Sequence, residues 1–271
     1  MNQKYVHGYE PAEAVRLQDQ ARTLVELLHS DTHYPKGSAV LEAGCGVGAQ
    51  TVALAKSSPE AKIVSIDVSA DSVARAEKIV QAEGITNVQF QRADIFSLPF
   101  EPETFDHVFL CFVLEHLPNP IDALVSLRSV LKPGGTITVI EGDHGSTYFH
   151  PESSAADAAI NCQVELQRRA GGDAHIGRQL YPLVSHSGYA PVQVSPRMVY
   201  VDASKPHLVE GFTKKTFTAM IEGIREPALE AGIIDSASFD KGVRALYRTA
   251  DTDGTFSYTF FKAVGQKSLS A

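Results

Sequence analysis

Three glycines alternate with other residues directly after a short apolar run, in the segment Val40-Leu41-Glu42-Ala43-Gly44-Cys45-Gly46-Val47-Gly48. Residues 39–41 predict a buried parallel strand, and the Ala- and Leu-rich residues 51–56 predict a helix after the glycines. A strand, a glycine turn and a helix in this order bring backbone N–H groups and a helix N-terminus against a ligand, because no Cβ holds the backbone away. We therefore predict that the turn binds a nucleotide-like cofactor, with a tight loop that binds nothing as the alternative.

The glycine spacing alone fits more than one cofactor. Gly44, Gly46 and Ala49 match the dinucleotide pattern G-x-G-x-x-G/A. Asp67 follows about 20 residues later, where a ribose-binding acid belongs in that pattern. An NAD(P)-dependent oxidoreductase is therefore the alternative enzyme class.

Four further features of the sequence narrow the choice of cofactor. Glu42 and Gly48 extend the turn to Glu-x-Gly-x-Gly-x-Gly, and Asp94 with Ile95 follows directly after the third expected strand. The segment Leu131-Lys132-Pro133-Gly134-Gly135 leads into the fifth strand. The chain then leaves the parallel sheet without the second βαβ half that a second nucleotide would need.

Together these features resemble the class I S-adenosylmethionine-dependent methyltransferases, in the small-molecule branch that includes the C-methyltransferases of ubiquinone and menaquinone biosynthesis. The resemblance covers residues 39–140, and the run Leu114-Glu115-His116-Leu117 is typical of that branch. Tyr9 with Arg16-Leu17-x-x-Gln20, and Gly177-Arg178 with Leu180, are similar to a narrower subgroup.

The resemblance implies a placement for the cofactor, S-adenosylmethionine. The bare backbone of the glycine turn approaches its methionine part, and Asp67 accepts from both ribose hydroxyls, which need two carboxylate oxygens. Val68 and Ile95 cover the two faces of the adenine, whose amine donates to Asp94; a turn cap is the structural alternative for Asp94. The expected cofactor-binding residues are Tyr9, Arg16, Gln20, Glu42, Gly44, Cys45, Gly46, Asp67, Val68, Ala93, Asp94, Ile95 and Cys111. Among them Glu42 orients the loop, and the first three face the methionine end from the N-terminal helix.

Methyl transfer from a sulfonium is an in-line displacement, so the protein mainly has to align the reacting atoms and exclude water. A general base is needed only where the nucleophile carries a proton, and no fixed catalytic motif is expected. His144 and His116 are the candidate catalytic residues, because each is expected just after a strand end; a turn or loop histidine is the alternative for both. Tyr148 and Arg178 are the candidate substrate-binding residues. No spacing of acids, histidines and cysteines predicts a metal site.

Apolar runs alternate with helical patterns over residues 39–140 and predict an α/β fold with a doubly wound, mostly parallel, Rossmann-like sheet. Seven strands are expected, the last of them antiparallel, and the remaining helical segments are expected to form lid insertions. The expected strands cover residues 39–41, 62–66, 88–92, 106–112, 136–140, about 192–201 and about 255–264. The expected domains are an N-terminal lid helix over 1–30, a cofactor-binding core over 31–145, and a helical cap and substrate region over 146–271 that returns to the sheet edge.

The composition excludes several function classes. The chain has 271 residues and a net charge of −8, which argues against a nucleic-acid partner. Its three cysteines follow neither disulfide nor metal spacing. Neither a signal peptide nor a membrane-spanning run is visible, so a cytoplasmic protein without a membrane partner is expected. We predict a small-molecule acceptor, with a macromolecular acceptor, or a cofactor-binding scaffold without turnover, as alternatives; a homodimer and the acceptor atom (O, N or C) stay open.

Overall fold

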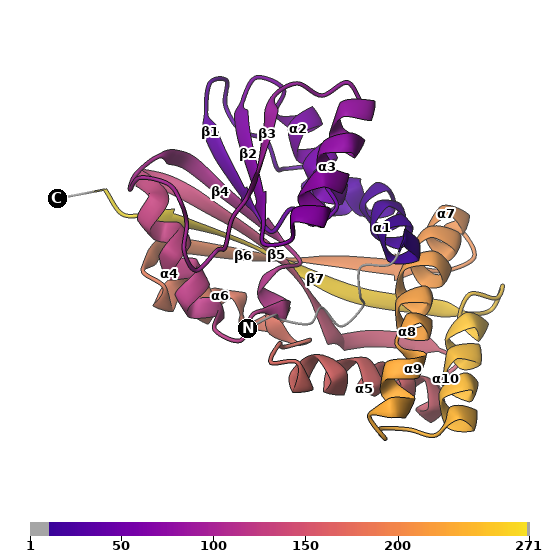
Figure 1. Cartoon of the computed structure of the whole chain (residues 1–271). Coiled ribbons are helices and arrows are strands. Elements are labelled where there is room, and N and C mark those ends of the chain that lie inside the picture. The colour runs from indigo at the N-terminus through magenta and orange to yellow at the C-terminus, as the bar shows by residue number, and fades with distance from the viewer. Residues whose placement is uncertain (1–10, 270–271) are drawn as a thin grey trace. The chain divides into compact units, whose positions relative to one another are not determined.

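Seven strands form one sheet in the computed structural model, which describes residues 11–269. Figure 1 shows this sheet, whose strand order is β3-β2-β1-β4-β5-β7-β6. Its strands are β1 (Ala39–Ala43), β2 (Lys62–Asp67), β3 (Val88–Arg92), β4 (Phe105–Cys111), β5 (Leu131–His150), β6 (Tyr189–Val201) and β7 (Thr255–Lys267). β1 pairs in parallel with β2 and β4, β2 with β3, and β4 with β5, while the last strands run antiparallel. The predicted Rossmann-like sheet is confirmed, and the carboxyl ends of β1 to β4 lie along one edge of it.

Helices alternate with the strands as far as β5 and dominate the chain after it. The helices before β5 are α1 (Pro11–His29), α2 (Ala49–Ser57), α3 (Ala70–Ala82), the 3₁₀ helix η1 (Leu114–His116) and α4 (Pro120–Val130). The helices after β5 are α5 (Ser154–Arg169), η2 (Ile176–Gln179), α6 (Leu180–His186), α7 (Pro206–Leu208), the π-helix η3 (Val209–Thr218), α8 (Ala219–Gly223), α9 (Arg225–Glu230) and α10 (Ser236–Arg248). The sequence of residues 205–249 predicts a helical outline broken around 232–236, and the structure has such a break between α9 and α10, with further divisions before it.

The described chain forms two compact units, which differ from the predicted domains in their boundaries. We call residues 28–141, 176–196 and 261–269 the glycine-turn unit, and residues 11–27, 142–175 and 197–260 the aromatic unit. The glycine-turn unit thus includes η2 and α6, which the sequence had assigned to the cap. Strands β5, β6 and β7 each contribute residues to both units.

The glycine-turn unit has a core of the kind that parallel strands require. Val108, Leu110 and Leu41 are fully buried, because helices cover both faces of these strands. Figure 1 shows α2 and α3 on one side of them and α4 and α6 on the other. The near-continuous apolar run of β4 follows from this double cover.

The aromatic unit is built around a cluster of rings. Its members come from η3 and β7 and are Phe212, Phe217, Phe256, Tyr258 and Phe260, all of them buried. The ring centroids of Tyr258 and Phe260 are 4.7 Å apart, and those of Phe217 and Phe256 are 4.8 Å apart. Such tilted contacts are favourable for aromatic pairs. In the same unit α5 packs against α10.

The fifth strand is much longer than the sequence predicts. Residues 136–140 were expected, whereas β5 extends from Leu131 to His150. The segment 131–135, which was predicted to lead into the strand, is part of β5 and interrupts its pairing with β4. Phe105 pairs with Leu131, whereas His107 pairs with Thr136. Beyond Glu141 the strand continues beside β7, where the Thr259 N–H donates to Ser146 Oγ at 2.9 Å. The prediction that His144 follows the strand is therefore wrong, because His144 lies within it.

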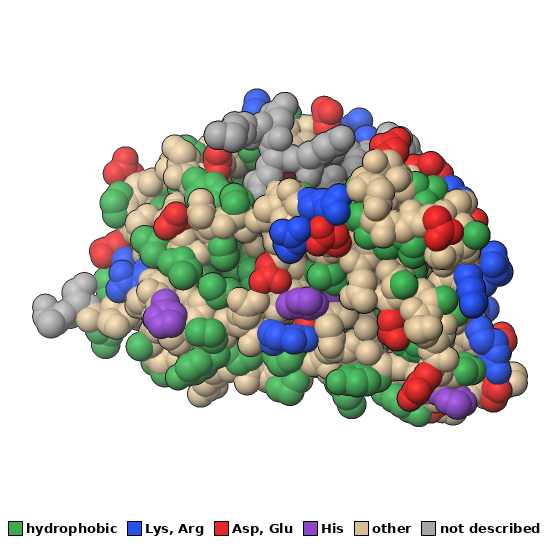
Figure 2. Space-filling view, turned by 90° about the horizontal axis from the view of Figure 1, so that it is seen from below, with side chains coloured by type: hydrophobic (Ala, Val, Ile, Leu, Met, Phe, Trp, Pro, Cys, Tyr) green, Lys and Arg blue, Asp and Glu red, His purple; other side chains and the backbone are tan. Residues whose placement is uncertain are grey.

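Charged side chains are mixed on the face of the molecule that Figure 2 shows. Lys and Arg side chains lie there beside Asp and Glu side chains instead of forming an extended basic field. Among residues 11–269, no helix combines the length and the apolar character that crossing a bilayer requires.

Candidate functional site

The glycine turn is fixed to the end of β2 through its backbone. The N–H groups of Gly44 and Cys45 both donate to the Ile66 carbonyl, at 2.8 and 2.9 Å. Gly44 and Gly46 have φ values of 78° and 52°, a region that residues with a Cβ rarely adopt. A Cβ on Gly44 would lie 2.5 Å from Val113 Cγ2, whereas a Cβ on Gly46 would meet no atom of residues 11–269 within 4 Å. Gly44 is therefore packed against Val113, and no described residue fills the corresponding space at Gly46.

Asp67 joins this turn to the next helix. Its Oδ2 accepts from the Gly46 N–H and its Oδ1 from the Ser69 N–H, each at 2.9 Å. Burial raises the pKa of Asp67, and hydrogen bonds from the backbone of Ser69, Gly46 and Val68 oppose that effect. A carboxylate has about four acceptor positions, so acceptor capacity remains beside these backbone hydrogen bonds. The side chain can thus accept from a hydroxyl group of a ligand while it holds the turn.

The residues after β3 form a turn beside Asp67. The Ala93 N–H donates to the Asp67 carbonyl at 3.0 Å, and Asp94 Oδ1 accepts from the Phe96 N–H at 2.9 Å. Asp94 is exposed and caps this turn, the alternative weighed for it from the sequence, but only one of its oxygens is used in that bond. Ile95 is half-buried, and Val68 is an apolar side chain that is 58% exposed. An apolar surface and a carboxylate oxygen are therefore available on the segments that follow β2 and β3.

Two of the predicted residues are buried near the carboxyl ends of β1 and β4. Glu42 is buried and accepts from Ser65 Oγ at 2.5 Å, and burial raises the pKa of Glu42 to about 7. Cys111 is buried at the end of β4, and burial raises the pKa of its thiol, as it does for Cys45. The role expected for Glu42, orienting the loop, stays a prediction.

The loop after β4 contains features that sequence reasoning missed. Phe112 has a φ of 59° without being glycine, a strained conformation that often marks functional sites. The N–H groups of Val113 and Leu114 both donate to Glu141 Oε1, at 3.0 and 2.7 Å. No residue type announces a positive φ at Phe112. An acid that closes an apolar strand was a usable signal for Glu141, as it was for Asp67.

The candidate catalytic histidines lie in different compact units. His116 belongs to η1 of the glycine-turn unit, is half-buried, and has its Nε2 3.7 Å from Glu115 Oε1. His144 is buried in the aromatic unit, where its ring centroid lies 5.6 Å from that of Tyr258 and 6.1 Å from that of Phe217. The backbone N–H of His144 donates to the Ala174 carbonyl at 2.9 Å.

The candidate substrate residues are also divided between the units. Tyr148 is 74% exposed in the aromatic unit, and Arg178 is exposed on η2 of the glycine-turn unit. On α1, Arg16 Nη1 donates to Gln20 Oε1 at 3.1 Å, as expected for neighbours four residues apart. Tyr9 lies outside the described residues.

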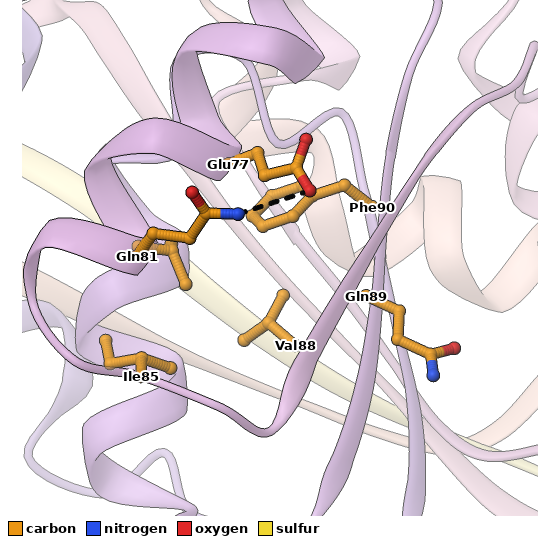
Figure 3. Close-up of a pocket in the computed structure, with 7 residues that line it drawn as sticks. Glu77, Gln81, Ile85, Val88, Gln89 and Phe90 are labelled. Atoms are coloured by element: carbon orange, nitrogen blue, oxygen red, sulfur yellow. Dashed lines mark hydrogen bonds between the residues drawn. The ribbon is translucent and has the colours of Figure 1, made fainter.

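A separate hollow of about 400 Å³ lies between α3 and the edge strand β3 (Figure 3). Apolar side chains of both elements line it, and the Gln81 amide donates to Glu77 at its rim, at 3.4 Å. None of the predicted site residues lines this hollow. In the part of the chain that the structure describes, no three His, Cys, Asp or Glu side chains are grouped as metal ligands.

Comparisons with known proteins agree with this geometry. A family model described as a methyltransferase domain matches residues 35–185. An uncharacterized methyltransferase of Schizosaccharomyces pombe is 34% identical over 54% of this chain and 54% of its own length. A demethylmenaquinone methyltransferase of Geobacillus stearothermophilus is 34% identical over 39% of this chain and 46% of its own length. The chain thus spans about half the length of these curated relatives.

A solved structure has a similar fold and a different chemistry. The [4+2]-cyclase SpnF superimposes with a TM-score of 0.56 at 20% identity, over 93% of this chain and 82% of its own. At such low identity the similarity concerns the fold alone, and the fold does not determine the reaction.

Proposed function

Because the chain belongs to the class I S-adenosylmethionine-dependent methyltransferases, we propose that it transfers a methyl group from S-adenosylmethionine to a small-molecule acceptor by in-line displacement. The observation that carries the proposal is the Asp67 carboxylate, which closes β2 and accepts from the Gly46 N–H of the glycine turn at 2.9 Å. An acid beside an open glycine backbone suits a ligand that combines a ribose with a flexible polar chain.

In this proposal the residues at the strand ends divide the cofactor among them. Gly44, Cys45 and Gly46 approach the methionine part through their backbone. Asp67 accepts from the ribose hydroxyls. Ala93, Asp94, Ile95 and Val68 receive the adenine, with the exposed Val68 side chain on one face. Cys111 borders the sulfonium at the end of β4, and Glu42 keeps the turn in place from below.

Arg16 and Gln20 are proposed to approach the methionine carboxylate from α1, with Tyr9. The guanidinium of Arg16 presents a planar fork of donors, which suits a carboxylate. Gln20 accepts from Arg16 in the described structure, and this bond limits the rotamers that the arginine explores.

S-adenosylmethionine supplies an activated methyl group, so the protein has to orient the acceptor, exclude water and, for a protonated nucleophile, accept a proton. We propose that His144 accepts the proton, because an imidazole is the side chain most easily poised to do so near neutral pH. The aromatic rings of Phe217 and Tyr258 pack beside it. His116 is the second candidate. Tyr148 and Arg178 are proposed to contact the acceptor.

Cofactor binding tests the proposal directly. Calorimetry on the purified chain should show binding of S-adenosylhomocysteine and none of NAD or NADP. Asp67→Ala should weaken the affinity about ten- to hundredfold, because the ribose hydroxyls lose a charged acceptor worth about 1.5–3 kcal/mol. Asp122→Ala is the matched control, since Asp122 is an exposed acid in the first turn of α4.

Two results would contradict the proposal. Binding of a nicotinamide dinucleotide in place of S-adenosylhomocysteine would assign the chain to the oxidoreductase alternative. Unchanged affinity in Asp67→Ala would remove Asp67 from the site. If S-adenosylhomocysteine binds, a screen of small metabolites with a labelled methyl group identifies the acceptor; labelling of protein or RNA alone would exclude a small-molecule acceptor.

A further inference from the structure

The loop that follows β4 is fastened to two consecutive residues of β5. The Phe112 N–H donates to the Ile140 carbonyl at 2.9 Å. The next two N–H groups, of Val113 and Leu114, donate to a single oxygen of Glu141, at 3.0 and 2.7 Å. Phe112 itself has a φ of 59°. Such a conformation persists only where the surroundings determine it, and these three hydrogen bonds do so.

The same loop packs directly on the glycine turn. A Cβ on Gly44 would lie 2.5 Å from Val113 Cγ2 and 3.0 Å from Val113 Cγ1. The Val113 side chain therefore occupies the space that the missing side chain of Gly44 leaves. A displacement of Val113 would alter the surface against which the turn packs. Glu141, which binds the Val113 N–H, therefore influences the turn through the contact between Val113 and Gly44.

From this chain of contacts we propose that Glu141 is a positioning residue of the cofactor site, which sets the glycine turn through Val113. The inference rests on the proposed function for its effect on the cofactor. Glu141 is fully buried, so it acts through its neighbours without touching a ligand. Its side chain is long enough to extend from β5 to the loop and accept from the backbone N–H groups of Val113 and Leu114.

The surroundings of Glu141 favour its neutral form. Burial, together with the neighbouring Glu115 carboxyl, raises the pKa of Glu141 well above its usual value. Its Oε2 is buried and has no hydrogen-bond partner among the described residues. An unpartnered oxygen costs less on a neutral acid than on a carboxylate. A neutral amide of the same length should therefore replace the acid, because its carbonyl oxygen accepts from the same two N–H groups.

Two substitutions distinguish the effect of the length of the Glu141 side chain from the effect of its acidic group. Glu141→Gln keeps the reach and removes the acid, and Glu141→Asp keeps the acid and shortens the reach by one methylene. We expect Glu141→Asp to bind S-adenosylhomocysteine about tenfold more weakly than wild type, and Glu141→Gln to bind within about threefold of wild type. Hydrogen exchange measured by NMR should show faster exchange of the Val113 and Leu114 amides in Glu141→Asp alone.

The outcomes are decisive in both directions. Wild-type affinity and exchange in Glu141→Asp, or equal losses in both variants, would overturn the positioning role. If wild type itself fails to bind S-adenosylhomocysteine, the proposed function fails, and the exchange rates still decide whether Glu141 orders the loop. Should Glu141→Asp not fold, Val113→Ala tests the same path and should weaken binding, against Val125→Ala on the exposed face of α4 as control; an unchanged affinity in Val113→Ala would overturn the proposal.

Discussion

In the glycine-turn unit the candidate residues are held by backbone hydrogen bonds, whereas in the aromatic unit His144 is surrounded by rings. Asp67 binds two amides at 2.9 Å, and Gly44 and Cys45 share one carbonyl. His144 packs beside Tyr258 and Phe217, at centroid distances of 5.6 and 6.1 Å. The first arrangement depends on directional groups in short segments of the chain. The second depends on the volume and shape of side chains from distant segments.

This difference suggests that the glycine turn and the surroundings of His144 serve separable tasks. A turn fixed by directional hydrogen bonds and positive φ angles has little freedom to adapt, which suits one invariant cofactor. A ring-lined surrounding changes whenever one ring changes size, which suits an acceptor that differs between relatives. Substitutions in the glycine turn and at Asp67 should then alter cofactor affinity, and substitutions around His144 should alter turnover.

The largest effect that we expect comes from His144→Phe. Phenylalanine keeps a ring among Tyr258 and Phe217 and removes the group that accepts a proton. Turnover with the native acceptor should fall about 10²–10⁴-fold, the range for loss of a general base, while calorimetry should give an unchanged affinity for S-adenosylhomocysteine. His150→Phe, at an exposed position near the end of β5, is the control.

A loss of cofactor affinity in His144→Phe would break the comparison, because His144 would then belong to the cofactor site. Turnover at the wild-type rate across neutral pH would remove His144 from catalysis, and His116 would be the next candidate. A decrease of only a few-fold would indicate an orienting contact.

The second prediction concerns Glu42, the buried acid of β1. Glu42 has a pKa of about 7 in the folded protein, against an ordinary value of 4.5. Between these values the folded state binds more protons than the unfolded state, so the free energy of unfolding decreases as the pH rises from about 4.5 to about 7. The difference corresponds to about 3 kcal/mol. Glu42→Gln removes this contribution, so the variant should gain about that much relative to wild type between pH 4.5 and pH 8.

Urea unfolding of both proteins at several pH values measures this change, and the difference between the two curves is the informative quantity. His29 acts in the opposite sense, because burial lowers its pKa to about 4. The stability contribution of His29 therefore rises with pH over about 4 to 6.5 and partly masks that of Glu42 in wild type. A difference between the proteins that is constant with pH would show that Glu42 does not titrate in this window.

The sequence predicts the glycine-turn unit well because its structure is determined locally. β3 has the predicted bounds, 88–92, and β1, β2 and β4 differ from prediction by one or two residues at their ends. β5 was predicted poorly, since its extension to His150 depends on pairing with β7, which lies more than 100 residues later in the chain. The roles of the predicted site residues remain predictions.

The features that sequence reasoning missed depend on contacts between segments. The positive φ of Phe112 is set by bonds to residues 140 and 141, and nothing in the residue type announces it. The ring cluster around His144 draws on η3 and β7, and aromatic residues at such spacing are as compatible with any buried core. Directional local motifs can be predicted from one sequence, whereas packing between distant segments cannot.

The smallest expected effect distinguishes two glycines of the same turn. Gly44→Ala and Gly46→Ala both place a Cβ on a residue with positive φ, which costs about 1–2 kcal/mol in each. Only the Cβ of Gly44→Ala meets Val113, at 2.5 Å, whereas that of Gly46→Ala enters open space. Gly44→Ala should therefore be the less stable variant in urea unfolding, by a further 1–3 kcal/mol or so, the usual cost of overpacking. Gly46→Ala should lose affinity for S-adenosylhomocysteine with little further loss of stability, because its Cβ stands where the ligand is proposed to lie. Equal stability of the two variants, with equal affinity, would mean that the turn adapts to a side chain, and the contrast between a rigid glycine-turn unit and an adaptable aromatic unit would not hold.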